Sequence, residues 1–264
     1  FQAKSELTNL LVDHCYVKVA DCNMLHIARR VSQTNVSHKL IQQSVLYSTS
    51  AKSNTITLSR DSNQVQGLAE YAQDFLSNPA DKLRKVDASV IDRVEMFHTD
   101  SVLCGLSALA LNCNAPTVLR NEALTDYTTS NPNGAFVFGS TQSVHAEKAV
   151  VANSSAVREW DSNGTVFGYN DRLGKAFQAG EFGHNDYYPV VVAASQLQQL
   201  DGAAAVLGML LHDEIRGRLC EVFSLKSYKI DHVVHGAIAT AVVYGTMMGA
   251  TVEQIESAVG MVVA

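Results

Sequence analysis

The sequence predicts a mainly α-helical domain, and three observations support that prediction. Apolar residues recur at every third or fourth position in successive segments between residues 63 and 264, as they do on the buried face of a helix. One short segment, 135–139, has the composition of a strand, and neither a β-α-β rhythm nor an internal repeat is present. Apolar side chains make up 47% of the chain, which is enough for a sizeable core. We therefore expect helix pairs packed around a core.

Two helices are expected in the first part of this domain. The first spans 63–77 and ends before Pro79, because proline does not continue a helix. Asp87 is placed to cap the second, which covers roughly 88–112. Its run 102–111 is strongly apolar, so we expect that run to be buried on nearly all sides.

The middle of the chain predicts a helix, a turn, a strand and a further helix. Pro116 precedes a helix at about 117–127, and an Asn-Pro-Asn-Gly turn leads into the strand 135–139. The next helix covers 144–160 and has a face of mostly small residues, which lets another helix or a ligand approach closely. The residues of that face are Ala149, Ala152, Asn153, Ala156, Val157 and Trp160.

Residues 161–186 interrupt the helical pattern. They are rich in Gly, Asn and Asp and have no apolar periodicity, which predicts a long loop. Long ordered loops inside compact domains are often functional. Beyond the loop, Thr251 and Gln254 have the spacing of a capping box. The remaining helices are expected at about 188–200, 202–222, 233–249 and 252–264.

Residues 1–60 have the features of a leader. Residues 22–60 carry no acidic side chain, several basic ones and seven serines. The segment that begins at Met24 can form an amphipathic helix with a cationic face, as mitochondrial transit peptides do. We therefore predict a mostly disordered extension, a helical domain over 61–264, and a location in the mitochondrial matrix. A flexible Ser-rich leader is the alternative, and the origin of 1–23 stays open.

The other end of the chain predicts a continuation. The last helical turn is strongly apolar, and neither a glycine nor a polar cap follows it before Ala264. Charged residues make up 17% of the chain, against about a quarter in a typical domain. Both observations favour a cut chain whose helix faces meet another domain or subunit. A terminal helix docked in its own core is the alternative.

Composition and motifs argue against several classes of function. A net charge of −6 disfavours nucleic-acid binding, and no run of about 18 apolar residues is present to span a membrane. The five cysteines include no closely spaced pair, so neither a zinc site nor an iron–sulfur cluster is expected. The motifs G-x-G-x-x-G, H-E-x-x-H and G-x-S-x-G are absent. We therefore expect neither a cofactor nor a metal.

Candidate catalytic residues gather in the 161–186 loop and in a second polar segment, 226–235. An acid, a hydroxyl and a histidine in one loop, with a further histidine in the other segment, suit proton transfer. On the residues alone, each histidine can equally be a cap or a surface residue. The side chains singled out are Asp161, Asn163, Thr165, His184, Lys226, Lys229 and His232.

Several separated stretches resemble the MmgE/PrpD family. Residues 153–165 (N-S-S-A-V-R-E-W-D-S-N-G-T) and 183–193 (G-H-N-D-Y-Y-P-V-V-V-A) carry the resemblance, which is closest to the mitochondrial, fungal-type 2-methylcitrate dehydratases. Residues 212–217 (H-D-E-I-R-G), 231–236 (D-H-V-V-H-G) and the segment 96–111 extend it. The resemblance covers nearly all of the expected helical domain.

The resemblance implies an architecture and an activity. The family has a large helical domain followed by a smaller α+β lid domain, which this chain lacks, and it usually forms homodimers. The implied activity is a cofactor-free lyase that dehydrates 2-methylcitrate to 2-methyl-cis-aconitate in the methylcitrate cycle of propionate catabolism. A cis-aconitate decarboxylase of the same fold is one alternative. A non-catalytic helical interaction protein, an inactive fragment and a metal-dependent hydro-lyase are the others.

The resemblance also maps a site onto this chain. The family's loop pattern corresponds to Asp161, Thr165 and His184, and His232 matches a further histidine, whereas Ser-Asn-Gly at 162–164 departs from the commoner D-F-[DN]-D-T form. We assign one proton transfer to His184, with Asp161 orienting it or the substrate hydroxyl. His232 is then the second acid/base group or a carboxylate donor. The candidates for substrate binding are Thr165, Asn163, Arg158, Lys226 and Lys229.

Overall fold

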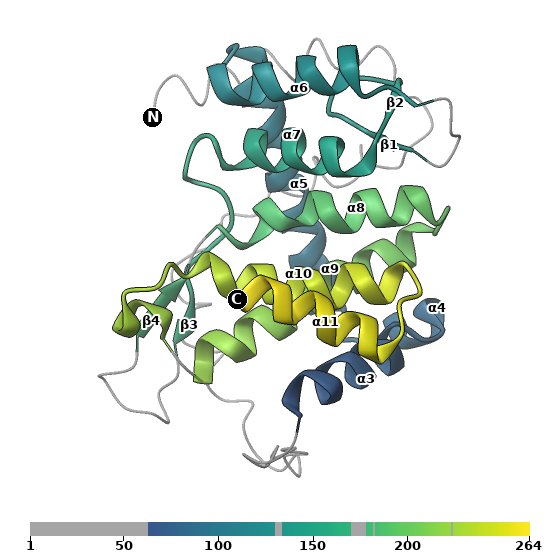
Figure 1. The fold of residues 1–264 in the computed structure, drawn as a ribbon, viewed down its shortest axis with the longest axis vertical. Coiled ribbons are helices and arrows are strands. Elements are labelled where there is room, and N and C mark those ends of the chain that lie inside the picture. Colours follow the sequence, from purple (N-terminus) through teal and green to yellow (C-terminus); the bar gives the residue numbers. More distant parts are fainter. Residues whose placement is uncertain (1–62, 130–133, 170–177, 182, 223) are drawn as a thin grey trace. The chain divides into compact units, whose positions relative to one another are not determined.

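The structure is a computed structural model. It describes residues 63–129, 134–169, 178–181, 183–222 and 224–264. The chain divides into two units, 1–57 and 58–264, and all of the described residues belong to the second. The predicted extension, with its transit segment, therefore lies outside the described residues. Within them the fold is mainly helical, as the sequence predicts (Figure 1).

Helices account for most of the described residues, and two small antiparallel hairpins join them. The α-helices are α3 (Gln64–Leu76), α4 (Pro79–Leu83), α5 (Ala88–Ala110), α6 (Asn114–Asp126), α7 (Ala146–Arg158), α8 (Tyr188–Leu197), α9 (Gly202–Val222), α10 (Val233–Met247) and α11 (Val252–Val263). The 3-10 helices are η2 (His184–Tyr187) and η3 (Leu225–Tyr228). The hairpins pair β1 (Ala135–Phe136) with β2 (Ser143–Val144) and β3 (Phe167–Tyr169) with β4 (Gln178–Glu181).

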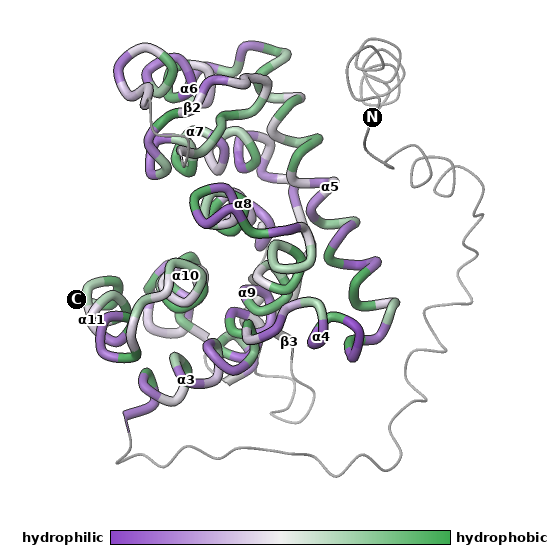
Figure 2. The backbone as a smooth tube through the Cα atoms, turned by 90° about the vertical axis from the view of Figure 1, so that its right-hand side faces the viewer, coloured by the Kyte–Doolittle hydropathy of each residue, from purple (hydrophilic) through white to green (hydrophobic). Residues whose placement is uncertain are grey.

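The helices form two groups that α5 and α8 connect (Figures 1 and 2). α6 and α7 lie at one end, and α3, α9, α10 and α11 lie at the other. α5 runs past both groups, and α8 lies between them. Each group has its own apolar cluster. The cluster around α6 and α7 is built from alanine and valine, whereas the other cluster contains larger side chains.

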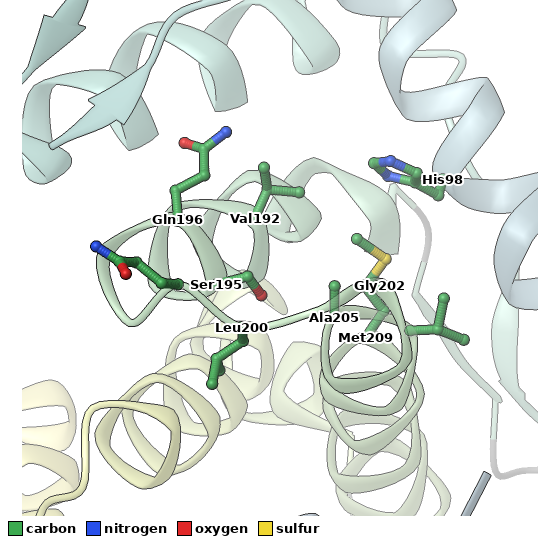
Figure 3. A pocket seen from close by; sticks show the side chains of 10 residues that line it. His98, Val192, Ser195, Gln196, Leu200, Gly202, Ala205 and Met209 are labelled. Carbon is green, nitrogen blue, oxygen red and sulfur yellow. The ribbon is translucent and has the colours of Figure 1, made fainter. Parts of the chain in front are cut away.

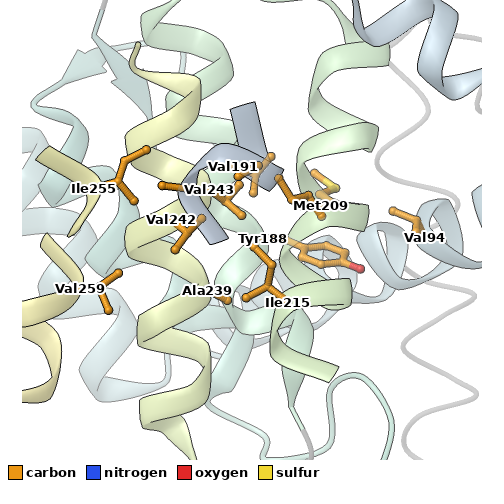
Figure 4. Close-up of a cluster of buried hydrophobic side chains, with 13 residues drawn as sticks. Val94, Tyr188, Val191, Met209, Ile215, Ala239, Val242, Val243, Ile255 and Val259 are labelled. Carbon is orange, nitrogen blue, oxygen red and sulfur yellow. The ribbon is translucent and has the colours of Figure 1, made fainter. Parts of the chain in front are cut away.

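The larger cluster holds together the helices that carry the candidate site. Tyr188 of α8 is fully buried in this cluster, which also contains Met209 and Ile215 of α9, Val243 of α10 and Ile255 of α11 (Figure 4). Burying one large apolar side chain contributes about 1.5–3 kcal/mol. The cluster therefore fixes the start of α8 against the middle of α9.

Side-chain caps begin α5 and α11 as the sequence predicts. Asp87 accepts a hydrogen bond from the Ser89 N–H at 2.8 Å at the start of α5. At the start of α11, Thr251 Oγ1 accepts from the Gln254 N–H at 3.3 Å, and Gln254 Oε1 accepts from the Thr251 N–H at 2.8 Å. The predicted capping box is confirmed, and it satisfies N–H groups that have no partner within the helix.

The strand predicted at 135–139 is only two residues long. It ends at Phe136 because side chains take the backbone hydrogen bonds beyond that point. Asn153 of α7 accepts from the Phe138 N–H at 2.8 Å and donates to the Phe136 carbonyl at 2.9 Å. Arg120 of α6 donates to the Phe138 carbonyl at 2.7 Å. The prediction was wrong for the last three residues, since these side chains replace a neighbouring strand.

α5 exposes more apolar surface than the sequence predicts. Cys104 and Ala108 are buried, but Leu103 is 54% exposed and Leu111 is 51% exposed. The prediction that 102–111 is buried on nearly all sides was therefore wrong. Because α5 packs along the edge of both helix groups, only one of its faces meets other helices (Figure 2).

α6 begins at Asn114, earlier than the predicted start at about residue 117. Pro116 lies in the first turn, where its missing N–H would have no helical partner, so it does not delay the helix.

None of the described helices is long and apolar enough to cross a membrane alone. α5 and α6 together reach that length and composition, with a bend of 91° between them.

The predicted loop at 161–186 contains regular structure. β3 and β4 pair within it, and η2 begins near its end and leads directly into α8. The prediction of an irregular loop was therefore wrong for these stretches. A two-stranded ribbon is held by backbone hydrogen bonds, so it can form in a Gly- and Asn-rich segment that has no apolar periodicity.

Candidate active site

His184 begins η2, directly after a sharp bend in the chain. Gly183 has a φ of +67°, and a Cβ there would clash with the Arg158 guanidinium, so the position favours glycine. The His184 ring is buried and meets Phe97 of α5 edge-on, with 4.4 Å between ring centroids. The centroid of the Tyr188 ring lies 6.0 Å from the centroid of the His184 ring. The backbone and both rings therefore fix the direction of the imidazole.

The two nitrogens of His184 face different groups. Nδ1 lies 3.4 Å from the backbone nitrogen of Thr165, whose N–H can only donate, so Nδ1 is the nitrogen with the lone pair. The proton of the neutral imidazole is then on Nε2, which lies 3.8 Å from Asp213 Oδ2 on α9. The same carboxylate oxygen accepts a hydrogen bond from the Tyr188 hydroxyl at 2.5 Å. His184 therefore lies between a loop amide and a helix carboxylate.

Burial lowers the pKa of His184 below its usual value of 6.5, because the imidazolium form would lose its hydration. The carboxylates of Asp213 and Asp100 oppose this effect, whereas Arg216 and His212 of α9 add to it. The net direction is downward, so His184 is a neutral imidazole at neutral pH. A neutral imidazole that has one acceptor nitrogen can act as a general base.

Asn185 joins the candidate loop to α5. It is fully buried, and its Nδ2 donates to the Phe97 carbonyl and to Asp100 Oδ2, both at 2.9 Å. Its Oδ1 accepts from Asn163 Nδ2 at 2.7 Å. The Gly164 N–H also donates to Asp100 Oδ2, at 2.9 Å. These hydrogen bonds hold residues 163 and 164 of the loop against α5 and against Asn185, the residue that follows His184.

Gly164 allows the loop to approach the imidazole. Its φ is +71°, and a Cβ at this position would lie 2.7 Å from His184 Nδ1. A larger residue would therefore strain the backbone and push the ring away.

Arg158 at the end of α7 lies close to two aspartates, one of which belongs to η2. Arg158 Nη2 lies 2.8 Å from Asp161 Oδ1, and Arg158 Nε lies 3.8 Å from Asp186 Oδ2. Burial raises the pKa of Asp186 to about 6, although Arg216 and Arg158 lower it. A carboxyl group that titrates near neutral pH therefore lies on the same helical turn as His184.

Asp186 should make the stability of the fold depend on pH. Its pKa is about 6 in the folded protein and close to 3.8 in an unfolded chain, so between these values the folded state holds the extra proton. The free energy of unfolding should therefore fall as the pH rises from about 4 to about 6. Asp186→Asn should remove this part of the dependence in urea titrations at a series of pH values. If the free energy of unfolding changes equally with pH in both proteins, the raised pKa of Asp186 is contradicted.

The predicted residues of the second segment lie at the start of α10 and just before it. His232 precedes the first residue of α10, and its Nδ1 lies 3.2 Å from Asp231 Oδ1. The Tyr187 hydroxyl donates to the Val233 carbonyl at 2.9 Å. The start of α10 therefore packs against η2, which carries the candidate histidine. Lys229 directly follows η3, has a φ of +59° and is exposed.

The structure brings several of the predicted residues together. Asn163 is linked through Asn185 to η2, and the Thr165 amide meets His184, so one end of the predicted loop does contact the other. Asp161, which was predicted to orient the histidine or the substrate hydroxyl, forms its ion pair with Arg158 at the end of α7. The side chain of Thr165 is exposed.

The carboxylate that faces His184 was missed by the sequence reasoning. Asp213 lies in α9, where His212 and Arg216 are 0% and 1% exposed. The sequence contains one signal of this arrangement: two strongly polar residues recur four positions apart in a helix that is otherwise largely apolar, so they share a face. Polar groups on such a face need partners if the face is buried.

A cavity of about 450 Å³ opens between α5, α8 and α9 (Figure 3). His98 faces it from α5, Val192 from α8 and Met209 from α9. The lining is mostly apolar, and burial lowers the pKa of His98. None of the predicted site residues lines this cavity, so it is separate from the loop at His184.

Within the described residues, no three His, Cys, Asp or Glu side chains converge in a way that could hold a metal ion.

The sequence profile of the MmgE/PrpD N-terminal domain matches residues 67–264. No solved structure matches the chain. The matched range runs from within α3 through α11 and includes every residue of the candidate site. The chain therefore belongs to the MmgE/PrpD family, which includes 2-methylcitrate dehydratase and related dehydratases.

Proposed function

We propose that this chain is the helical domain of a hydro-lyase that dehydrates 2-methylcitrate to 2-methyl-cis-aconitate in propionate catabolism. Family membership and the likeness of the stretch 153–165 to the fungal-type enzymes support this choice of substrate. The single observation that carries the proposal is the setting of His184. A buried, neutral imidazole is fixed between the Thr165 amide and the Asp213 carboxylate.

Dehydration of a β-hydroxy acid requires two proton transfers. A base removes the proton from the carbon next to a carboxylate, and the electron pair of that C–H bond forms the double bond while the C–O bond breaks. The departing hydroxide takes up a proton and leaves as water. We assign His184 to one of these transfers, because Nδ1 has a lone pair and the pKa of the ring is lowered. The contact between the Thr165 amide and Nδ1 is long, so a substrate group can displace it.

The remaining roles follow from what surrounds His184. His232 is proposed as the second acid/base group, since the start of α10 packs against η2. Asn163 Oδ1 is buried and accepts no hydrogen bond from the described part of the chain, so it can accept one from the substrate hydroxyl. We place Thr165 near a carboxylate of the substrate. Arg158 and Lys229 would supply positive charge for a tricarboxylate.

The assembly is proposed on separate grounds. The matched profile is that of an N-terminal domain, which supports an α+β lid domain following it. The exposed Leu103 of α5 and Leu111 directly after it support a surface that a second subunit covers in a homodimer. The composition of residues 22–60 supports import into the mitochondrial matrix. The proposed route uses only acid and base groups of the protein.

The experiment is a spectrophotometric assay of the full-length protein with 2-methylcitrate, citrate and cis-aconitate. We expect the ultraviolet absorbance of a conjugated alkene to rise with 2-methylcitrate and to persist in the presence of a chelator. Release of carbon dioxide from cis-aconitate would replace the proposal with a decarboxylase. Loss of turnover with the chelator would indicate a metal-dependent hydro-lyase, and no reaction with any tricarboxylate would indicate a non-catalytic protein.

A further inference from the structure

Asp213 contacts three aromatic side chains from three elements. Its Oδ2 accepts from the Tyr188 hydroxyl of α8 at 2.5 Å and lies 3.8 Å from His184 Nε2 of η2. Its Oδ1 lies 3.9 Å from Nδ1 of His212, its neighbour on α9. Oδ1 is buried, and no hydrogen bond to it is formed by the described residues. The family resemblance assigns no role to this carboxylate.

The position of Asp213 is determined by the core. The Tyr188 ring is fully buried in the larger apolar cluster, so its hydroxyl has one accessible direction (Figure 4). The hydroxyl donates to Asp213, which fixes that carboxylate opposite Nε2 of His184. On the other side of the ring, the Thr165 N–H points at Nδ1. The imidazole is therefore placed between a group that only accepts and a group that only donates.

Other groups also surround His184, and several of them affect its pKa, but none of those named below lies opposite Nε2 as Asp213 does. Arg216 and His212 face it from α9, Asp100 from α5 and Tyr188 from α8. The Asp100 Oδ2 atom is already bonded to the Gly164 N–H and to Asn185 Nδ2. Asp213 Oδ2, by contrast, lies within ion-pair distance of Nε2, at 3.8 Å.

We propose that Asp213 is a positioning residue, which holds the proton of His184 on Nε2 and so keeps Nδ1 available as the base, while Tyr188 fixes the carboxylate. An aspartate that fixes the tautomer of a catalytic histidine has a large effect on turnover, because the wrong tautomer presents a proton where the reaction needs a lone pair. This role in catalysis rests on the proposed function of His184. The effect on the tautomer does not depend on it.

Asp213→Asn separates this role from a purely structural one. The amide oxygen can still accept from the Tyr188 hydroxyl, so the fold is kept. The amide NH₂ can donate a hydrogen bond to Nε2, which favours the tautomer with the proton on Nδ1. That proton would then point at the Thr165 N–H. If the carboxylate only anchors Tyr188, Asp213→Asn should leave the tautomer of His184 unchanged.

The test combines nuclear magnetic resonance with kinetics on the full-length protein. Long-range ¹H–¹⁵N spectra, with the His184 signals assigned through His184→Gln, should show the Nε2–H tautomer in the wild type and the Nδ1–H tautomer in Asp213→Asn. The pKa of His184 should fall further in the variant, because a charge that raises it is lost. The kcat should fall by about 10²–10⁴-fold with little change in KM. Glu214→Gln is the matched control, since the next carboxylate of α9 pairs with Arg218 at 2.8 Å, and it should change neither readout.

Each outcome decides the proposal. An Nδ1–H tautomer in the wild type would overturn it without any variant, and so would an unchanged tautomer in a folded Asp213→Asn protein. Reversal of the tautomer with normal kcat would overturn the role in catalysis. If the wild type turns over none of the tricarboxylates but the tautomer reverses as expected, the proposed function fails while the positioning role is upheld.

Discussion

Replacement of His184 by glutamine should lower the kcat for dehydration of 2-methylcitrate by about 10²–10⁴-fold, the usual contribution of a general acid or base. Glutamine fills much of the same volume and still offers an acceptor to the Thr165 N–H. It cannot exchange a proton near neutral pH. The loss should therefore appear mainly in turnover, because glutamine gives up the ring contacts with Phe97 and Tyr188 but still fills space beside both rings.

The measurement is steady-state turnover by alkene absorbance, with circular dichroism to confirm that the variant is folded. His145→Gln is a suitable control, since His145 lies on the surface next to Glu147 at the start of α7. It should keep the wild-type rate. A rate for His184→Gln within a few-fold of the wild type would remove this histidine from the mechanism.

Asn185→Ala should destabilise the domain by about 3 kcal/mol. The side chain is fully buried and joins three groups, namely the Phe97 carbonyl, Asp100 and Asn163. Alanine would leave all of them without this partner, and a buried polar group that loses its hydrogen bond costs about 1–3 kcal/mol. The loop would also lose its anchor beside His184, so activity should fall with stability.

Urea denaturation measures this change in the free energy of unfolding. Ser101→Ala is the matched control, because Ser101 makes a single hydrogen bond to the backbone carbonyl of Asn185, at 2.9 Å. Its loss should cost about 1 kcal/mol. Equal stabilities of Asn185→Ala and Ser101→Ala would show that the asparagine network does not hold the loop.

The helices were largely predictable because their apolar spacing and caps are local features. Thr251 and Gln254 form the predicted capping box, and the helix at 252–264 is present as α11. The strand at 135–139 was overestimated because the side chain that replaces its neighbour, Asn153, comes from a later helix. Such a bond depends on how α7 packs, and no local pattern in the sequence specifies it.

The candidate site was predictable on its loop and not on its helices. The loop 161–186 was identified by its composition, and the structure joins Asn163 near its start to Asn185 near its end. Asp213 was missed because a charged residue in a helix usually faces solvent. Its role depends on the packing of α9 against α8 and η2, which places the Tyr188 hydroxyl and the imidazole beside it.

The central claim is that His184 transfers a proton in the dehydration of a tricarboxylate. It is tested most directly by incubating the full-length protein with 2-methylcitrate in deuterium oxide and following the substrate and product by nuclear magnetic resonance. We predict an alkene that has lost one water, with one deuterium entering recovered 2-methylcitrate through the reverse reaction, and both changes slowed by about 10²–10⁴-fold with His184→Gln. Alkene formation and deuterium incorporation at wild-type rates in His184→Gln, or loss of carbon dioxide in place of water, would contradict the account.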